Sequence, residues 1–222
     1  AAPALAANPQ VEFDTTAGVI KLELYPDAAP KTVANFLEYV KSGQYAGTQF
    51  HRVIDGFMIQ GGGFTTDYVK KPTRPPIPIE SESSVKAGLK NVPGTIAMAR
   101  TGDPNSATAQ FFINVNDNAR LNFTSATPQG YGYTVFGKVI EGMDVVTKIA
   151  KAPKGATGTL HPEISPADAP ATQIVIKSAK VIGGWIVLED GSQVGLATVG
   201  GRLTQPSEVD VGLFQHHLLA GR

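Results

Sequence analysis

The 222-residue chain contains no cysteine. Disulfide bonds, a thiol nucleophile and a metal site built from thiolates are therefore excluded. No apolar run approaches the length that crosses a bilayer as a helix. Nineteen basic and nineteen acidic residues give a formal net charge of zero. Because no basic stripe is present, nucleic acid is not an expected partner.

Short strands dominate the pattern of the chain. Alternating apolar and polar residues, or short apolar runs, predict strands at 11–15, 18–25, 48–54, 58–61, 95–100, 110–115, 134–139 and 173–182. The clearest helix opens at Pro30 and ends before Gly43, and a second covers Met143–Ala150. Many short strands with only two helices favour a β-barrel or a sandwich with capping helices.

The most informative stretch is FHRVIDGFMIQGG, from Phe50 to Gly62. Arg52 lies there among apolar residues, and an arginine offers five donors in a rigid fork. Phe57 and Met58 are of the types that line pockets for small apolar groups, and Gln60 could hold a peptide backbone. A structural ion pair is the alternative interpretation of Arg52.

Phe57 and Met58 are neighbours and would point to opposite faces of a regular strand. Both can line one pocket only if the chain bends, which Gly56 and the run Gly61-Gly62-Gly63 allow. The glycine run lacks a Gly-Lys-Ser/Thr ending and a Gly-x-Gly-x-x-Gly spacing, so a nucleotide cofactor is not expected.

A second block, Gln110-Phe111-Phe112-Ile113-Asn114-Val115, follows later in the chain. Together with Thr32-Val33-Ala34-Asn35-Phe36, Gly94–Ala99 and Val135–Val139, these blocks resemble, in order, the cyclophilin family of peptidyl-prolyl cis-trans isomerases. The resemblance implies a closed eight-stranded antiparallel β-barrel capped by two α-helices. It also implies an enzyme that rotates X–Pro peptide bonds and assists protein folding, without any metal or cofactor.

The resemblance assigns roles to individual residues. Arg52 would be the catalytic residue. The residues that it implies for substrate binding are Phe57, Met58, Gln60, Ala99, Arg100, Gln110, Phe112, Leu121 and Tyr133. Of these, Phe57, Met58, Phe112 and Leu121 would form the proline pocket. The others would position the substrate backbone or border the groove.

Two positions depart from the pattern of the family's most studied members. Arg120 replaces a tryptophan that contributes to cyclosporin binding, and Tyr133 replaces a histidine. The resemblance therefore implies weak binding of cyclosporin. Arg100 stands where asparagine is common, although the backbone could act there. His51, beside Arg52, is interpreted as structural because the reaction transfers no net proton.

The chain divides into three parts. Residues 1–9 include Ala4-Leu5-Ala6, the small-x-small form of a signal-peptidase site, and are interpreted as the remnant of an export signal, with a linker or cloning scar as the alternative. Residues 10–183 form the cyclophilin-like domain. Residues 184–222 form an extension of unknown role, for which the sequence predicts a hairpin from Trp185 and a weak helix after Pro206.

Short segments such as Tyr131-Gly132-Tyr133 are similar to those of bacterial exported cyclophilins. This resemblance implies a periplasmic location.

Proline-containing unfolded or extended polypeptides are the expected partners. A chaperone or scaffold that binds proline with only incidental turnover is the rival interpretation. Arg52 favours the enzyme, since binding alone would need only the pocket.

Overall fold

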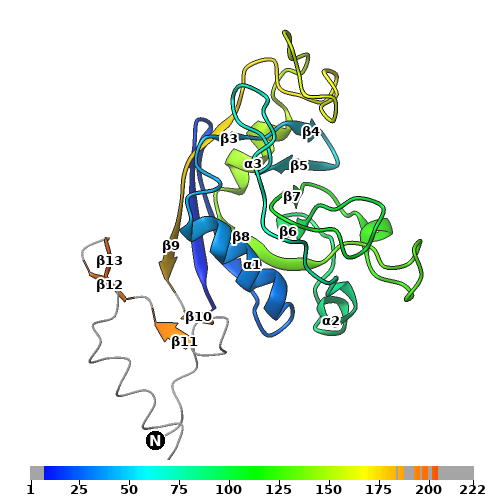
Figure 1. Ribbon diagram of the computed structural model, residues 1–222, viewed down its shortest axis with the longest axis vertical. Helices are drawn as coiled ribbons and strands as arrows, with labels where there is room; N and C mark the ends of the chain where they lie inside the picture. Colours follow the sequence, from blue (N-terminus) through cyan, green and yellow to red (C-terminus); the bar gives the residue numbers. More distant parts are fainter. Residues whose placement is uncertain (1–7, 184, 188–192, 196, 200–201, 205–222) are drawn as a thin grey trace, which may run out of the picture.

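The computed structural model describes residues 8–183, 185–187, 193–195, 197–199 and 202–204. A nine-stranded antiparallel sheet curls around the core (Figure 1). In the order in which they pair, its strands are β3 (Thr48–Gln49), β9 (Val175–Gly183), β1 (Gln10–Thr15), β2 (Gly18–Leu24), β8 (Val135–Glu141), β6 (Thr95–Met98), β7 (Phe111–Asn114), β5 (Met58–Gly61) and β4 (Arg52–Ile54). The predicted mainly-β antiparallel fold is confirmed.

The two ends of the sheet meet because β3 and β4 belong to one run of chain. β3 pairs with β9, and β4 pairs with β5. At the end of β3, the Gln49 N–H donates to the Phe64 carbonyl (3.0 Å), and just after it the Phe50 N–H donates to the Ile174 carbonyl (2.9 Å). Counted as one strand, β3 and β4 give the eight strands that the resemblance implied, and few strand edges remain exposed.

Three α-helices occur in the part of the chain that the structure describes: α1 (Pro30–Lys41), α2 (Ser81–Lys86) and α3 (Met143–Ala150), with a 3-10 helix, η1, at Ala119–Leu121. The prediction of two helices omitted α2. This helix buries Ser81 and Ser84, whose hydroxyls donate to the carbonyls of Tyr131 and Val135. It has no apolar stripe, so hydrophobic periodicity could not reveal it. None of the described helices has the length and apolarity needed to span a membrane.

Glu80 caps α1 from a distant part of the chain. The residue before the helix, Ala29, has no side chain that can accept a hydrogen bond. The Glu80 carboxylate instead accepts the N–H groups of Thr32 (2.6 Å) and Lys31 (3.3 Å). A carboxylate at a helix N-terminus is favourable because it satisfies free donors and faces the positive end of the helix dipole.

Aromatic rings fill the core between α1 and the sheet. The Phe36 ring centre lies 5.0 Å from that of Phe136 and 5.9 Å from that of Phe111. Phe111 is fully buried there, whereas its neighbour Phe112 belongs to a separate apolar cluster. The two faces of β7 therefore serve different purposes, because neighbouring residues of a strand point to opposite faces: one face builds the core and the other the groove described below.

The segment after β9 forms short antiparallel pairs. β10 (Trp185–Val187) pairs with β11 (Gln193–Gly195), and β12 (Ala197–Val199) pairs with β13 (Arg202–Thr204). The predicted hairpin is present, but its second strand is divided between β11 and β12. The helix predicted after Pro206 and most of the proposed export remnant lie outside the described residues.

We propose that residues 184–222 are dispensable for folding. β9 pairs with β1 along the strand and with β3 at Val175 and Ile176, so the sheet is already joined on both sides of β9 before the tail begins. Truncation after Gly183 should lower the melting temperature by less than roughly 5 °C, about 1–2 kcal/mol for a domain of this size. β10 lies near α1, and β12 lies near β9. A larger fall, measured against the full chain by calorimetry, would show that these contacts belong to the fold.

Candidate active site

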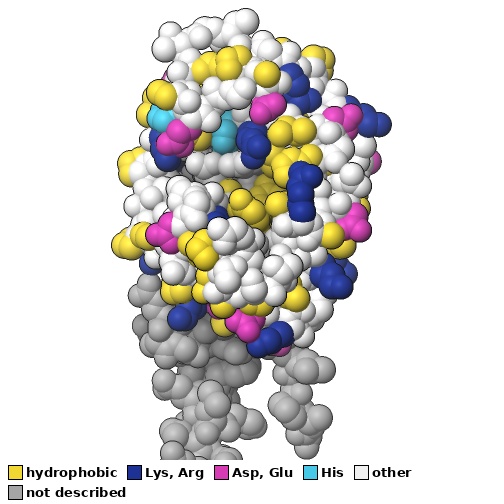
Figure 2. Space-filling model, turned by 90° about the vertical axis from the view of Figure 1, so that its right-hand side faces the viewer, with side chains coloured by type: hydrophobic (Ala, Val, Ile, Leu, Met, Phe, Trp, Pro, Cys, Tyr) yellow, Lys and Arg dark blue, Asp and Glu magenta, His cyan; other side chains and the backbone are white. Residues whose placement is uncertain are grey.

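The residues predicted from the sequence converge on one cavity of about 320 Å³. Figure 2 shows part of the surface where an apolar floor lies in a hollow bordered by basic side chains. The cavity is lined by His51, Arg52, Phe57, Met58, Gln60, Phe64, Ala99, Arg100, Gln110, Phe112, Leu121, Tyr133 and Glu163. All ten predicted residues are among them. His51, Phe64 and Glu163 were not predicted to belong to the site.

The floor of the cavity is apolar. Met58 of β5 and Phe112 of β7 are almost completely buried, and Leu121 and Tyr133 pack against them. The Tyr133 ring meets Phe112 edge to face, with ring centres 5.6 Å apart. A concave apolar surface with a few polar groups at its border suits a small apolar ligand group.

A sharp turn lets Phe57 and Met58 line the same cavity. Gly56 has a φ of +71°, a conformation that side chains disfavour. The Phe57 N–H closes the turn by donating to the Ile54 carbonyl (3.1 Å), and β5 begins at Met58. The predicted bend is therefore confirmed, and Gly56 is the residue that permits it.

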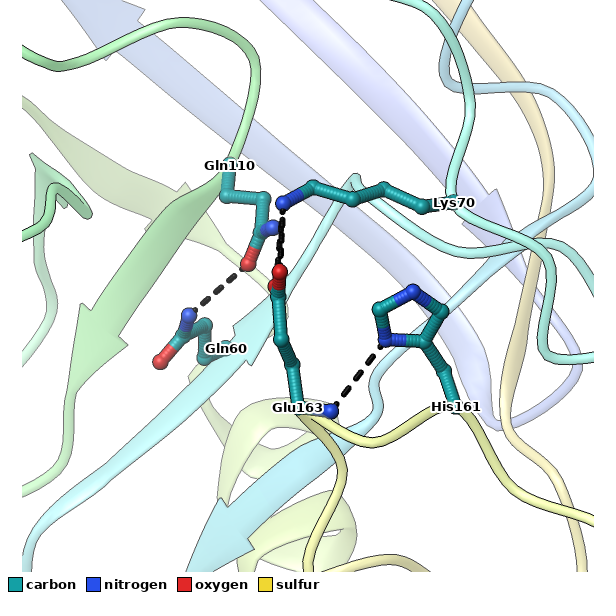
Figure 3. Close-up of polar contacts among 5 residues, drawn as sticks. All are labelled: Gln60, Lys70, Gln110, His161 and Glu163. Carbon is teal, nitrogen blue, oxygen red and sulfur yellow. Dashed lines mark hydrogen bonds and ion pairs between the residues drawn. The ribbon is translucent and has the colours of Figure 1, made fainter.

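A chain of polar contacts holds Arg52 beside this floor. Arg52 and Gln60 are opposite each other in the β4–β5 pair. The Arg52 Nη1 donates to Gln60 Oε1 (3.4 Å), and Gln60 Nε2 donates to Gln110 Oε1 (2.9 Å; Figure 3). Asp168 approaches the Arg52 Nε from the other side, at 4.0 Å. The Arg52 side chain is still 47% exposed, so most of its donors can reach a ligand.

Gly63 makes room for Gln110. A Cβ atom at position 63 would lie 2.6 Å from atoms of the Gln110 side chain, well inside contact distance. The glycine run therefore does more than allow a bend: its last member permits close approach of the side chain that orients Gln60.

Buried asparagines connect two walls of the cavity from beneath. Asn118 Nδ2 donates to the Phe57 carbonyl (2.9 Å) and to Asn114 Oδ1 (2.7 Å). Asn114 Nδ2 donates to Asn91 Oδ1 (3.0 Å), and Asn91 Nδ2 donates to the Leu121 carbonyl (3.1 Å). Sequence reasoning missed this network. The sequence feature that could have indicated the network is Asn114, a polar residue inside an apolar strand. Its side chain must find hydrogen-bond partners when it is buried.

The polar end of the cavity contains His51 and an ion pair. His51 is 4% exposed and lies edge-on to the Phe64 ring, 4.6 Å away. Burial and the charge of Arg52 lower the pKa of His51 to about 4. Lys70 Nζ binds Glu163 (2.8 Å; Figure 3) and, through this hydrogen bond, keeps the pKa of Glu163 below its usual range.

Comparisons with known proteins show the family to which the chain is similar. The family model described as "Cyclophilin type peptidyl-prolyl cis-trans isomerase/CLD" matches residues 10–181. A peptidyl-prolyl cis-trans isomerase of Streptomyces antibioticus is 57% identical over 173 residues, covering 78% of this chain and 98% of the relative. Peptidyl-prolyl cis-trans isomerase B of Escherichia coli K12 is 50% identical over 171 residues, covering 77% and 98%.

Solved structures show the same likeness. A cyclophilin-type isomerase of Cryptosporidium parvum superposes with a TM-score of 0.60 at 28% identity, covering 78% of this chain and 97% of that one. A second crystal structure of that protein, determined in the presence of the dipeptide Ala-Pro, gives a TM-score of 0.59.

The fold, the match to the family model and the likeness to solved structures together define an isomerase built on a curled antiparallel sheet. The chain belongs to the cyclophilin-type peptidyl-prolyl cis-trans isomerase family. It is an enzyme that interconverts the cis and trans forms of X–Pro peptide bonds.

His51 should make the stability of the fold depend on pH. Its folded-state pKa of about 4 lies below the ordinary value of 6.5, so between these values the unfolded chain binds a proton that the folded protein does not. The contribution of His51 to the free energy of unfolding is complete above pH 6.5. It falls by about 3 kcal/mol in total as the pH drops through 4. Urea unfolding should therefore show a weaker loss of stability between pH 7 and pH 4 in His51→Gln than in the wild type.

The same pH dependence in His51→Gln and the wild type would contradict the assignment.

Proposed function

We propose that the cavity is the active site of the isomerase and that it acts on proline residues in unfolded or extended polypeptides. One observation carries the proposal: Arg52, half-exposed and held by Gln60, borders an apolar floor that includes Phe112. The floor would hold the proline ring while the guanidinium faces the peptide bond before it. The Cryptosporidium parvum relative, studied in the presence of Ala-Pro, supports this class of ligand.

The chemistry follows from the barrier to rotation. Twisting an X–Pro bond breaks amide resonance and costs about 18–20 kcal/mol, so uncatalysed exchange takes roughly tens to hundreds of seconds. The prolyl nitrogen becomes pyramidal in the twisted state and exposes a lone pair. A guanidinium N–H directed at that nitrogen stabilises the twisted state more than either planar form, which is the requirement for catalysis. The apolar floor keeps water from competing for the donor.

The substrate backbone would lie along the polar side of the cavity. Gln60 and Gln110 offer amide donors and acceptors there. The Ala99 N–H is already engaged with the Gln110 carbonyl (3.0 Å). We therefore assign the contact with the peptide to the Ala99 carbonyl and to the backbone of Arg100.

Replacement of Arg52 distinguishes this enzyme from a scaffold that only binds proline. Arg52→Ala should reduce the exchange rate of a short X–Pro peptide by about 10²–10³, because one preorganised donor is lost. Exchange NMR measures the rate directly. Arg74→Ala, an arginine outside the cavity, should retain wild-type exchange. Wild-type turnover in Arg52→Ala would refute the role given to Arg52 and favour the scaffold.

We propose that cyclosporin binds weakly. Where the resemblance places a tryptophan, the Arg120 guanidinium carbon lies 4.6 Å from the centre of the Phe57 ring. A cyclosporin molecule would have to desolvate this charge rather than cover a flat apolar ring. Titration calorimetry should give an affinity well short of nanomolar, and Arg120→Trp should bind more tightly. Nanomolar binding by the unmodified protein would overturn the argument.

We further propose that the protein assists folding in a bacterial periplasm. The motif Ala4-Leu5-Ala6 and the likeness of Tyr131-Gly132-Tyr133 to exported cyclophilins support this location. Fractionation of the producing cells should recover the protein with the periplasmic contents; recovery with the cytosol would contradict the proposal.

A further inference from the structure

Arg120 stands at the border of the cavity on η1, directly before the lining residue Leu121. Its guanidinium lies over Phe57, another lining residue, at 4.6 Å. A cation over an aromatic face is attracted to the ring and is held in place by it. A guanidinium that lies over a ring still has N–H groups that can point away from the ring and bind a ligand. The side chain is exposed, so a peptide can reach it.

Arg100 differs from Arg120 although it makes a similar stack, with its guanidinium carbon 4.6 Å from the centre of the Tyr133 ring. Its donors are engaged: Nε and Nη2 bind the Gly132 carbonyl (3.0 and 2.7 Å), and Nη1 binds the Thr101 carbonyl (2.9 Å). Arg100 therefore fixes the loop that carries Tyr133. Within the described ranges, Arg120 has neither a hydrogen bond nor an ion pair, so its donor set is uncommitted.

The charges around the cavity leave a positive border at Arg120. Glu163, which lines the polar end, is paired with Lys70 (2.8 Å). Asp168 lies 4.0 Å from Arg52. Since these two carboxylates face other cations, an incoming carboxylate finds a donor at Arg120 without having to displace a partner.

We propose that Arg120 forms a subsite for an acidic side chain next to the substrate proline. The inference rests on the proposed function, because the subsite borders the same cavity. An aspartate or glutamate would accept two parallel N–H bonds from the guanidinium, the strongest geometry for this pair. The stack on Phe57 orders the arginine in advance, which reduces the entropy lost on binding. The enzyme then selects among X–Pro sequences by charge as well as by the proline ring.

Matched peptides test the subsite. Peptides that differ only by Glu, Gln or Lys, placed immediately before or after the proline, are compared by kcat/KM from exchange NMR at low salt. The wild type should favour Glu over Gln by about five-fold at one of the two positions, the range of an exposed but ordered ion pair. Arg120→Gln should bring the Glu-to-Gln ratio of kcat/KM close to one, and Arg120→Glu should favour the peptide that contains Lys. Added salt should compress the wild-type ratio, since the pair is exposed.

Lys180→Gln is the matched control. It removes one positive charge from β9, a strand that contributes no residue to the cavity, and it should keep the wild-type ratio. Equal ratios in the wild type and Arg120→Gln would overturn the subsite, as would an equal loss in Lys180→Gln, which would indicate a general field effect. Loss of turnover with every peptide would contradict the proposed function itself, a result distinct from turnover of all of them without preference.

Discussion

The position of Arg52 depends on its cross-strand contact with Gln60. The β4–β5 register sets the two residues opposite each other, and Gln60 is oriented in turn by Gln110. Gln110 occupies that place only because Gly63 has no side chain. The arginine is thus held by neutral amides rather than by a close buried carboxylate. Its charge stays available to a ligand, which a tight buried ion pair would prevent.

The groove and the core share the same strands, so their stabilities are linked. On β7, Phe111 packs into the barrel while Phe112 forms the floor of the cavity. The asparagine network below fixes the carbonyls of Phe57 and Leu121. Every member of such a network must be satisfied, because an unpaired buried amide costs about 1–3 kcal/mol. The walls of the pocket are therefore set by the fold and do not wait for a substrate to assemble them.

The features that could be predicted from the sequence are those that depend on the local pattern of residues. Alternation and short apolar runs located the strands, Pro30 located the start of α1, and Gly56 indicated the bend that brings Phe57 and Met58 together. The roles of the site residues came from the resemblance to a family and not from periodicity.

Contacts between distant segments could not be predicted in the same way. Glu163 comes from a long loop, and nothing in the local pattern places it at the cavity that contains His51. α2 was missed because it docks through serine hydroxyls. The contact of Arg120 with Phe57 depends on the segment before η1, where Asn116 and Asn118 donate to the carbonyls of Gly56 and Phe57, and a single sequence does not specify these contacts. A change of residue type at position 120 was visible in the sequence, but its contact was not.

A crystal structure of the protein with a bound peptide that contains Ala-Pro tests the central claim most directly. The account predicts the proline ring on Phe112, Met58 and Leu121, with a guanidinium nitrogen of Arg52 directed at the prolyl nitrogen at about 3 Å. A proline bound elsewhere, or an Arg52 turned away to Asp168 with the prolyl nitrogen out of reach, would contradict it.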